Sequence, residues 1–226
     1  MKKQRVIIAG SEGIIGKQLS SYFSKDYRVY KLSRRFGHDL TDELFVKNWF
    51  LKHKAEYLVN CYGMSDPVTK ADKRTTLFDI SLASVEEYLK VNAVSVFSVC
   101  REFAKSKTSK AIVNFSSIYG IVSPLPALYE KGEKHIGYSM SKAAVIQLTR
   151  HLAVHLAPRV RVNCIAPGGI EHKQSRLFKA KYAKHTPMGR MMKKNELNGL
   201  VKFLCSDESS YVTGSLIAAD GGWTAN

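Results

Sequence analysis

The sequence predicts an α/β fold, in the form of a doubly wound parallel sheet of six to seven strands with helices on both faces. Three observations predict it. Short β-branched runs alternate with longer stretches of helical periodicity, the first run leads directly into a glycine-rich turn, and 45% of the residues are hydrophobic, which is enough for a sizeable core. A chain of 226 residues is short for two domains of roughly 150 residues each, so we expect one domain over 1–226.

The expected strands are short runs rich in valine and isoleucine, and the expected helices are stretches in which apolar residues recur every three or four positions. In chain order, the expected strands are 5–9, 28–32, 57–60, 111–115, 160–165 and 216–219. Helical spacing occupies 14–23, 84–105 and 143–156. Each of these helices lies between two strands, as parallel pairing requires.

The charge balance is strongly basic. Lys and Arg number 35 against 19 Asp and Glu, which gives a net charge of +16 and favours anionic partners or substrates. The four cysteines, Cys61, Cys100, Cys164 and Cys205, lie far apart in or beside apolar stretches, so we expect reduced thiols in a cytoplasmic protein. No signal-peptide core follows the basic start and no run of about 20 apolar residues is present, so we expect no membrane attachment.

The segment 171–194 differs in composition from the rest of the chain. It holds eight Lys or Arg with a single Glu and has weak apolar periodicity, which predicts a mobile loop or a helical lid. Its charge would attract a phosphate-bearing substrate. The general basicity of the chain explains the same charge without a ligand, and both explanations stay open. No group of His, Cys and carboxylates has the spacing of a metal site, so no metal is expected.

The first expected strand leads into a glycine-rich turn at 10–16 and then into a helix. Gly10, Gly13 and Gly16 would permit a tight turn, the approach of a pyrophosphate to the backbone, and close packing of the helix on the strand. The helix N-terminus would present free N–H groups to that anion. This pattern indicates a dinucleotide-binding site.

The end of the second expected strand indicates which dinucleotide binds. Folds that select NAD usually carry an acidic residue there, whereas this chain has Ser33, Arg34 and Arg35. A hydroxyl and two guanidinium groups would hold a 2′-phosphate through charge-assisted hydrogen bonds, which favours NADP(H) over NAD(H). Glu12 in the glycine-rich turn argues the other way, and a solvated basic turn would explain the arginines as well.

The spacing of Tyr138 and Lys142 predicts a pair of groups at one site. Residues four apart on a helix share a face, so the phenol and the ammonium can point together. Tyrosine ordinarily has a pKa near 10, and an adjacent ammonium would stabilise the phenolate and permit proton exchange near neutral pH. Ser116 and Ser117 follow an expected strand and add hydroxyls to the same region.

These motifs, in this order, resemble the short-chain dehydrogenase/reductase family over nearly the whole chain. Further matches lie at 60–63, which keeps only the outer residues of the family's Asn-Asn-Ala-Gly signature, and at 162–170, 213–214 and 220–222. The resemblance implies a single NAD(P)-binding Rossmann domain that transfers hydride between nicotinamide and a secondary alcohol or ketone. It also implies a homodimer or homotetramer.

The resemblance assigns a role to each matching residue. Tyr138 would be the general acid in reduction and the base in oxidation, and Lys142 would lower its pKa and hold the nicotinamide ribose. Ser117 would position the substrate oxygen, and Asn92 would hold a water of the proton relay. The implied cofactor contacts are Gly10, Ser11, Gly13, Ile15, Gly16, Ser33, Arg34, Asp39, Leu40, Asn60, Cys61, Gly63, Tyr138, Lys142, Pro167, Gly168 and Ile170.

Three features depart from the family pattern. Only four residues separate Arg34 from Asp39, so the helix that usually follows the second strand looks deleted, the third-strand region is shortened and one sheet edge is trimmed. Twenty residues separate Ser117 from Tyr138, which predicts an extra loop at 124–134 beside the mouth of the site. The glycine-rich turn has the GxxGxxG spacing of extended family members, but the chain has no room for their sugar-binding domain.

The resemblance extends to the short-chain reductases of bacterial flagellin and surface-polysaccharide modification, through 116–120, the loop at 124–134 and 167–170. It implies a small-molecule substrate such as a sugar, a sugar phosphate or a nucleotide sugar. An alternative is a 3-oxoacyl-(acyl-carrier-protein) reductase, whose acidic carrier would also suit a basic rim. A third hypothesis is a protein that binds NADP or nucleic acid without catalysis, but no nucleic-acid motif supports it.

Overall fold

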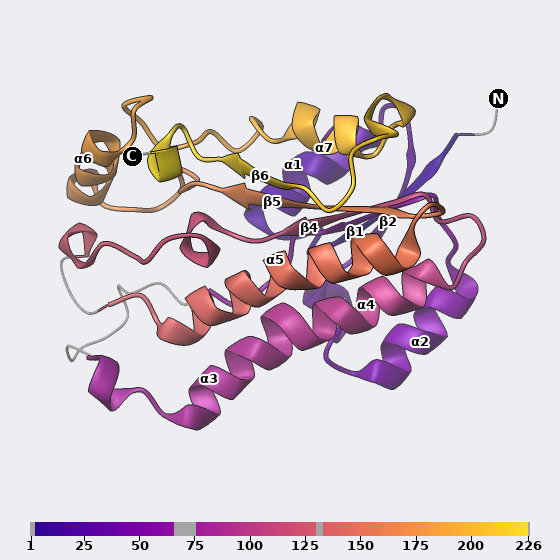
Figure 1. Ribbon diagram of the computed structural model, residues 1–226, viewed down its shortest axis with the longest axis horizontal. Helices are drawn as coiled ribbons and strands as arrows, with labels where there is room; N and C mark the ends of the chain where they lie inside the picture. The colour runs from indigo at the N-terminus through magenta and orange to yellow at the C-terminus, as the bar shows by residue number, and fades with distance from the viewer. Residues whose placement is uncertain (1–2, 66–75, 130–132, 226) are drawn as a thin grey trace.

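The computed structural model describes residues 3–65, 76–129 and 133–225, which form one parallel sheet covered by helices on both faces (Figure 1). All the strands expected from the sequence are present, and the fifth begins one residue later and ends two residues later than predicted. They are β1 (Arg5–Ala9), β2 (Arg28–Leu32), β3 (Tyr57–Asn60), β4 (Ala111–Phe115), β5 (Arg161–Pro167) and β6 (Leu216–Ala219). Their order across the sheet is β2-β1-β3-β4-β5-β6, and each neighbouring pair is parallel.

The helices divide between the two faces of the sheet because successive strands are added on opposite sides of β1. The chain first adds β2 on one side of β1 and then adds β3 to β6 on the other side. On one face lie α1 (Ile14–Phe23) and α7 (Asn198–Leu204). On the other lie α2 (Glu43–Lys52), α4 (Ser95–Ala104) and α5 (Ile136–Leu156). The remaining helices are α3 (Leu82–Leu89), which leads into α4, and α6 (Arg176–His185), which lies beyond the strand ends (Figure 1). No helix among the described residues combines the length and apolarity that crossing a bilayer requires.

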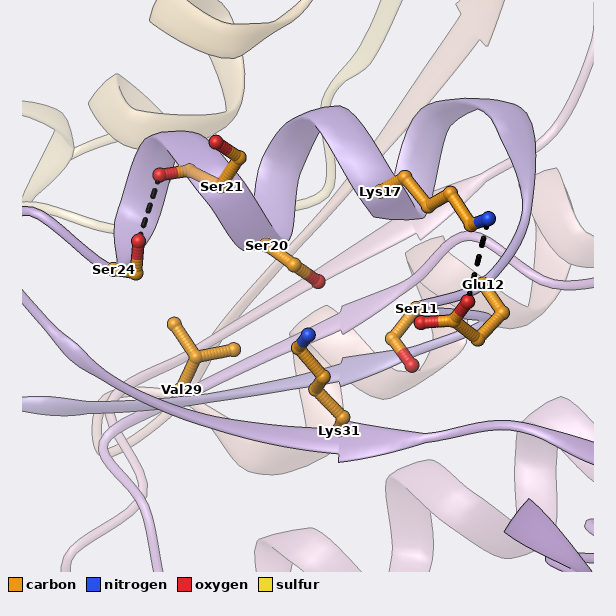
Figure 2. A pocket seen from close by; sticks show the side chains of 8 residues that line it. All are labelled: Ser11, Glu12, Lys17, Ser20, Ser21, Ser24, Val29 and Lys31. Atoms are coloured by element: carbon orange, nitrogen blue, oxygen red, sulfur yellow. Dashed lines mark hydrogen bonds and ion pairs between the residues drawn. The ribbon is translucent and has the colours of Figure 1, made fainter. Parts of the chain in front are cut away.

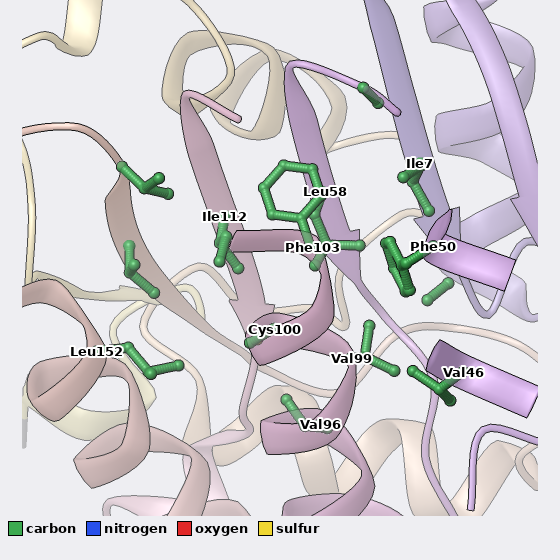
Figure 3. Packing of buried hydrophobic residues seen from close by; sticks show 14 of the residues in the cluster. Ile7, Val46, Phe50, Leu58, Val96, Val99, Cys100, Phe103, Ile112 and Leu152 are labelled. Carbon is green, nitrogen blue, oxygen red and sulfur yellow. The ribbon is translucent and has the colours of Figure 1, made fainter. Parts of the chain in front are cut away.

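Alternate residues of the central strands pack against opposite helical layers, as the two-residue period of a strand dictates. Figure 3 shows Ile7, Leu58 and Ile112 of the strands facing Phe50 of α2 and Phe103 of α4. On the other face, the side chains of the intervening strand residues pack on α1 and α7. Because β1, β3 and β4 are buried on both faces, they appear in the sequence as continuous apolar runs.

One edge of the sheet ends at β2, which has no further strand on its outer side among the described residues. This trimmed edge agrees with the prediction from the short spacing between Arg34 and Asp39. Helix α2, which carries the chain from β2 across the sheet to β3, was not predicted from the sequence. Asp42 caps this helix by accepting hydrogen bonds from Leu44 N and Phe45 N, and Val46 and Phe50 anchor it in the core.

The helix predicted over 84–105 is interrupted. It consists of α3, a π-helical segment at Lys90–Val94, and α4. The wider turn of a π-helix often marks a functional position. Asn92 lies in this segment and is completely buried.

Candidate active site

A cavity of about 1140 Å³ opens at the carboxyl ends of the strands. The strand order reverses between β1 and β3, and the loops that follow these two strands, at Gly10 and Cys61, line the cavity. In open parallel sheets, the crevice at such a reversal is the usual place for a ligand.

The glycine-rich turn after β1 forms one wall of this cavity. Gly10 has φ +91°, and a Cβ there would lie 2.7 Å from Tyr62 N, so a side chain would be both strained and obstructed. A Cβ on Gly16 would overlap the carbonyl oxygen of Gly10. Gly13 is the N-cap of α1 and provides no capping side chain, so the first N–H groups of the helix remain available to an anion. These features fit a dinucleotide pyrophosphate.

The end of β2 forms the far end of the cavity, which Ser33 and Arg34 line. Arg34 begins a short 3₁₀ turn, and Ser33 Oγ accepts a hydrogen bond of 3.2 Å from Arg35 N. The Ser33 hydroxyl therefore keeps its proton for donation to a ligand. Arg35 does not line the cavity, and its Nη1 lies 3.9 Å from Glu12 Oε2. Of the two arginines predicted here, Arg34 is thus the one that lines the cavity.

The other predicted cofactor residues divide into two groups. The cavity is lined by Gly10, Gly13, Ile15, Ser33, Arg34, Asp39, Leu40, Cys61, Gly63, Tyr138, Lys142, Pro167, Gly168 and Ile170. Asp39 accepts hydrogen bonds from the backbone N–H and the hydroxyl of Thr41, which lower the pKa of its carboxyl group. Burial raises the pKa of the Cys61 thiol to about 12, so the thiol is neutral and supplies no charge to the site.

Three residues of the predicted cofactor set, Ser11, Gly16 and Asn60, do not line the cavity. Ser11 donates a hydrogen bond to Leu32 O and borders a separate hollow of about 420 Å³ between α1 and β2 (Figure 2). Gly16 packs beneath the turn, and Asn60 donates a 2.9 Å hydrogen bond to Asn114 Oδ1 in the interior. These three residues pack behind the residues that line the cavity. That they contact a cofactor directly remains a prediction.

The three residues predicted to act on a substrate come together at the middle of the cavity. Ser117, Tyr138 and Lys142 all line it. The Ser117 hydroxyl hydrogen-bonds Tyr138, and Lys142 Nζ lies 5.8 Å from the centroid of the Tyr138 ring. A strand end and one turn of a helix therefore converge on a single point, as the four-residue spacing of the phenol and the ammonium indicates.

Local packing fixes the distance between β4 and α5. Ser116 Oγ donates a 2.7 Å hydrogen bond to Lys142 O, and Lys142 Nζ donates a 3.0 Å bond to Phe115 O. Gly120 passes so close to α5 that a Cβ would lie 2.7 Å from the carbonyl carbon of Lys142. The strand end that carries Ser117 is therefore attached directly to the helix.

The titration of the site follows from its burial. Lys142 is 6% exposed, and desolvation lowers its pKa from 10.5 to about 8, which still leaves an ammonium at neutral pH. Burial also raises the pKa of Tyr138, while hydrogen bonds from Ser117 and Ser65 act in the opposite direction. The resting site therefore pairs a protonated phenol with an ammonium.

Asn92 lies behind the cavity and not in its lining. Its Oδ1 accepts a 2.6 Å hydrogen bond from Met64 N, and its Nδ2 donates bonds of 3.0 Å to Met64 O and to Ser141 Oγ. The side chain thus joins the π-helical segment to the loop after β3 and to α5. That Asn92 holds a water of the proton relay remains a prediction.

Several further residues of the cavity lining were not predicted from the sequence. They are Met64, Ser65, Tyr119, Leu128, Tyr129, Lys134, Phe178, Tyr182 and Met191. The predicted extra loop supplies Leu128, Tyr129 and Lys134, and within it Tyr129 donates a 3.0 Å hydrogen bond from its hydroxyl to that of Tyr119. The length of this loop was the available signal, but spacing in a loop does not reveal which side chains face inward. Residues 130–132 of the loop lie outside the described residues.

The basic segment 171–194 contains α6 and packs over the cavity mouth. Lys181 Nζ donates a 2.9 Å hydrogen bond to Ala127 O, and the Phe178 ring lies 5.8 Å from that of Tyr129. Tyr182 stacks on Trp223 and accepts a hydrogen bond of 2.5 Å from Gly169 N. Within the described ranges no cluster of His, Cys, Asp and Glu could hold a metal ion.

Known proteins share this fold and about a third of the residues of this sequence. The family described as enoyl-(acyl carrier protein) reductase matches residues 29–224. A 3-oxoacyl-(acyl-carrier-protein) reductase from Aquifex aeolicus is 32% identical over 96% of this chain and 86% of its own length. The post-translational flagellin modification protein A from Campylobacter coli is 32% identical over 93% of this chain and 83% of its own. A crystal structure of a short chain dehydrogenase from Leptospira borgpetersenii with bound NAD+ superposes with a TM-score of 0.86 and 34% identity, and covers 99% of this chain and 94% of that one.

Proposed function

The chain belongs to the short-chain dehydrogenase/reductase family of oxidoreductases, and on that premise we propose that it transfers hydride between NADP(H) and a secondary alcohol or ketone of a sugar substrate. The observation that carries this proposal is the convergence of Ser117, Tyr138 and Lys142 in the cavity where the strand order reverses. A bound nicotinamide would supply the hydride donor or acceptor.

In this proposal Tyr138 is the residue that transfers the proton. Its raised pKa keeps the phenol protonated at neutral pH, which is the form that a general acid needs in reduction. The Ser117 hydroxyl would hold the substrate oxygen beside the phenol. As negative charge develops on Tyr138, the Lys142 ammonium stabilises it by attraction across a poorly hydrated space. In oxidation the same groups act in reverse, with Tyr138 as the base.

Four features of the described residues support a preference for NADP(H). Arg34 lines the cavity at the end of β2, and the residues beside it in the sequence, Ser33 and Arg35, carry no carboxylate that would bind the ribose hydroxyls of NAD. The Ser33 hydroxyl can donate to the same phosphate. Glu12 is neutralised by Lys17 at 3.4 Å and Arg35 at 3.9 Å, so it does not oppose an anion at Arg34.

The substrate proposal rests on the lining of the mouth. The hydroxyls of Ser65, Tyr119 and Tyr129 and the ammonium of Lys134 suit a substrate with several hydroxyls and an anionic group. A role of segment 171–194 as a lid fits the contact of Lys181 with Ala127. The flagellin modification relative supports a sugar in surface glycan biosynthesis. The relative that reduces acyl-carrier thioesters is equally similar and favours the alternative substrate, a 3-oxoacyl thioester.

A panel assay separates these substrates. NADPH oxidation and NADP+ reduction are followed by absorbance with sugar phosphates, nucleotide sugars and acyl-carrier thioesters. We expect turnover with a sugar and none with thioesters. The reverse result would establish the alternative, and no turnover of any carbonyl or alcohol would contradict the proposed activity. Cytoplasmic location and assembly into homodimers or homotetramers are part of the same proposal, and sedimentation analysis tests the assembly.

A further inference from the structure

A second ammonium lies against Tyr138, and it comes from the loop that precedes α5. Lys134 Nζ lies 4.3 Å from the centroid of the Tyr138 ring, closer than Lys142 Nζ at 5.8 Å. Lys134 also donates a 2.8 Å hydrogen bond to Ser65 Oγ, and the Ser65 hydroxyl in turn hydrogen-bonds Tyr138. One ammonium therefore contacts both the phenol ring and a hydroxyl that binds the phenol.

The geometry of these contacts favours a negative charge on Tyr138. A cation over an aromatic face is attracted by the π electrons of the ring, and the attraction grows when the ring is part of a phenolate. The bond from Lys134 also leaves the proton of the Ser65 hydroxyl free to point at the phenolic oxygen, because the ammonium donates and the serine oxygen accepts. Both contacts act in the same direction as Lys142.

We infer that Lys134 is a positioning residue for proton transfer at Tyr138: it stabilises the phenolate from above the ring and orients Ser65 as a donor to the phenolic oxygen. The inference rests on the proposed function and adds two groups, Lys134 and Ser65, to the set of Ser117, Tyr138 and Lys142. Because Lys134 lies on the extra loop, this loop takes part in the chemistry as well as in shaping the mouth.

The other titratable groups around Tyr138 do not supply this effect. Tyr119 and Tyr129 carry hydroxyls that would repel a phenolate if ionised, but burial raises the pKa of both, so they remain neutral. The Tyr88 ring meets Tyr138 edge to face at 6.4 Å and stacks on His135. Within the described part of the chain, the ammonium groups in contact with the Tyr138 ring are those of Lys134 and Lys142.

The first test titrates Tyr138 directly. Tyrosinate absorbance is measured against pH for the protein and for its Tyr138→Phe variant, and the difference isolates the Tyr138 transition. The same comparison, with and without Tyr138→Phe, is then made in the protein that carries Lys134→Met. Even under the full screening of water, unit charges about 4 Å apart interact by about 0.7 of a pKa unit. We therefore expect Lys134→Met to raise the Tyr138 midpoint by about half a unit or more, and Lys134→Arg to leave it nearly unchanged.

A matched control removes the same charge elsewhere. Lys107 is exposed in the turn before β4, at the opposite end of the strands from the site. Lys107→Met should leave the midpoint unchanged. A shift of equal size in Lys107→Met and Lys134→Met would overturn the inference, because the effect would then belong to net charge. An unshifted midpoint in Lys134→Met would overturn it as well.

The second test measures turnover over a series of pH values. In the reductive direction the alkaline limb of the pH profile reports loss of the phenolic proton, so it should move to higher pH in Lys134→Met and in Ser65→Ala. A rise in KM without movement of that limb would assign Lys134 to substrate binding and contradict the inference. Absence of turnover in the unmodified protein would contradict the proposed function instead, while the absorbance titration would still decide the role of Lys134.

Discussion

Replacing Lys142 by methionine should abolish turnover and yet stabilise the folded protein at neutral pH. Burial lowers the pKa of Lys142 from 10.5 to about 8, so the unfolded chain binds more protons than the folded one between these values. The cost of holding the buried ammonium is fully present below pH 8 and disappears as the pH rises toward 10.5. A shift of this size corresponds to about 3 kcal/mol at pH 7.

The hydrogen bond from Lys142 to Phe115 O at 3.0 Å acts in the other direction. A methionine removes this bond from a charged donor, which costs about 1–3 kcal/mol at any pH. The variant should therefore be about 1 kcal/mol more stable at pH 7. Its advantage over the unmodified protein should shrink by about 2 kcal/mol between pH 7 and pH 10.

Urea unfolding at several pH values measures this difference, with the fluorescence of Trp49 and Trp223 as the signal. Lys107→Met, which removes an exposed ammonium, should show no comparable pH dependence. A difference between Lys142→Met and the unmodified protein that stays constant from pH 7 to pH 10 would refute the reasoning, because it would mean that Lys142 keeps an ordinary pKa in the folded state.

Three other substitutions, one of them with a matched control, test the cofactor wall and the substrate contact. Arg34→Ala should weaken NADPH binding about 10- to 100-fold and NADH binding much less, as measured by titration calorimetry; equal losses would remove the 2′-phosphate argument. Gly16→Ala should lower the free energy of unfolding by about 2 kcal/mol or more because its Cβ meets the Gly10 carbonyl. Gly199→Ala, which meets nothing within 4 Å, should be neutral or slightly stabilising, and similar effects at the two glycines would contradict this. Ser117→Ala should lower kcat about 100-fold, and an unchanged kcat would exclude it from the substrate contact.

Much of the fold was readable from the sequence because the central strands are buried on both faces. Each buried strand is a short apolar run, and the glycine-rich turn follows the first of them. The pair of Tyr138 and Lys142 was also readable, since a helix places residues four apart on one face whatever surrounds it.

Other elements could not be predicted from the sequence, for physical reasons. Helix α2 buries only Val46 and Phe50, so its apolar periodicity is weak, and its existence follows from the need to cross from β2 to β3. The π-helical segment around Asn92 depends on hydrogen bonds to Met64 and Ser141, which are distant in sequence. Lys134 is a loop residue, and loops lack the regular spacing that predicts where a side chain points.

Comparison of the protein with its Tyr138→Phe variant tests the central claim most directly. The variant keeps the ring and its packing but loses the proton that the site is built to transfer. We expect NADPH to bind with nearly unchanged affinity while hydride transfer to the carbonyl substrate falls below detection. Turnover at the unmodified rate in the variant would contradict the assignment of proton transfer to this phenol.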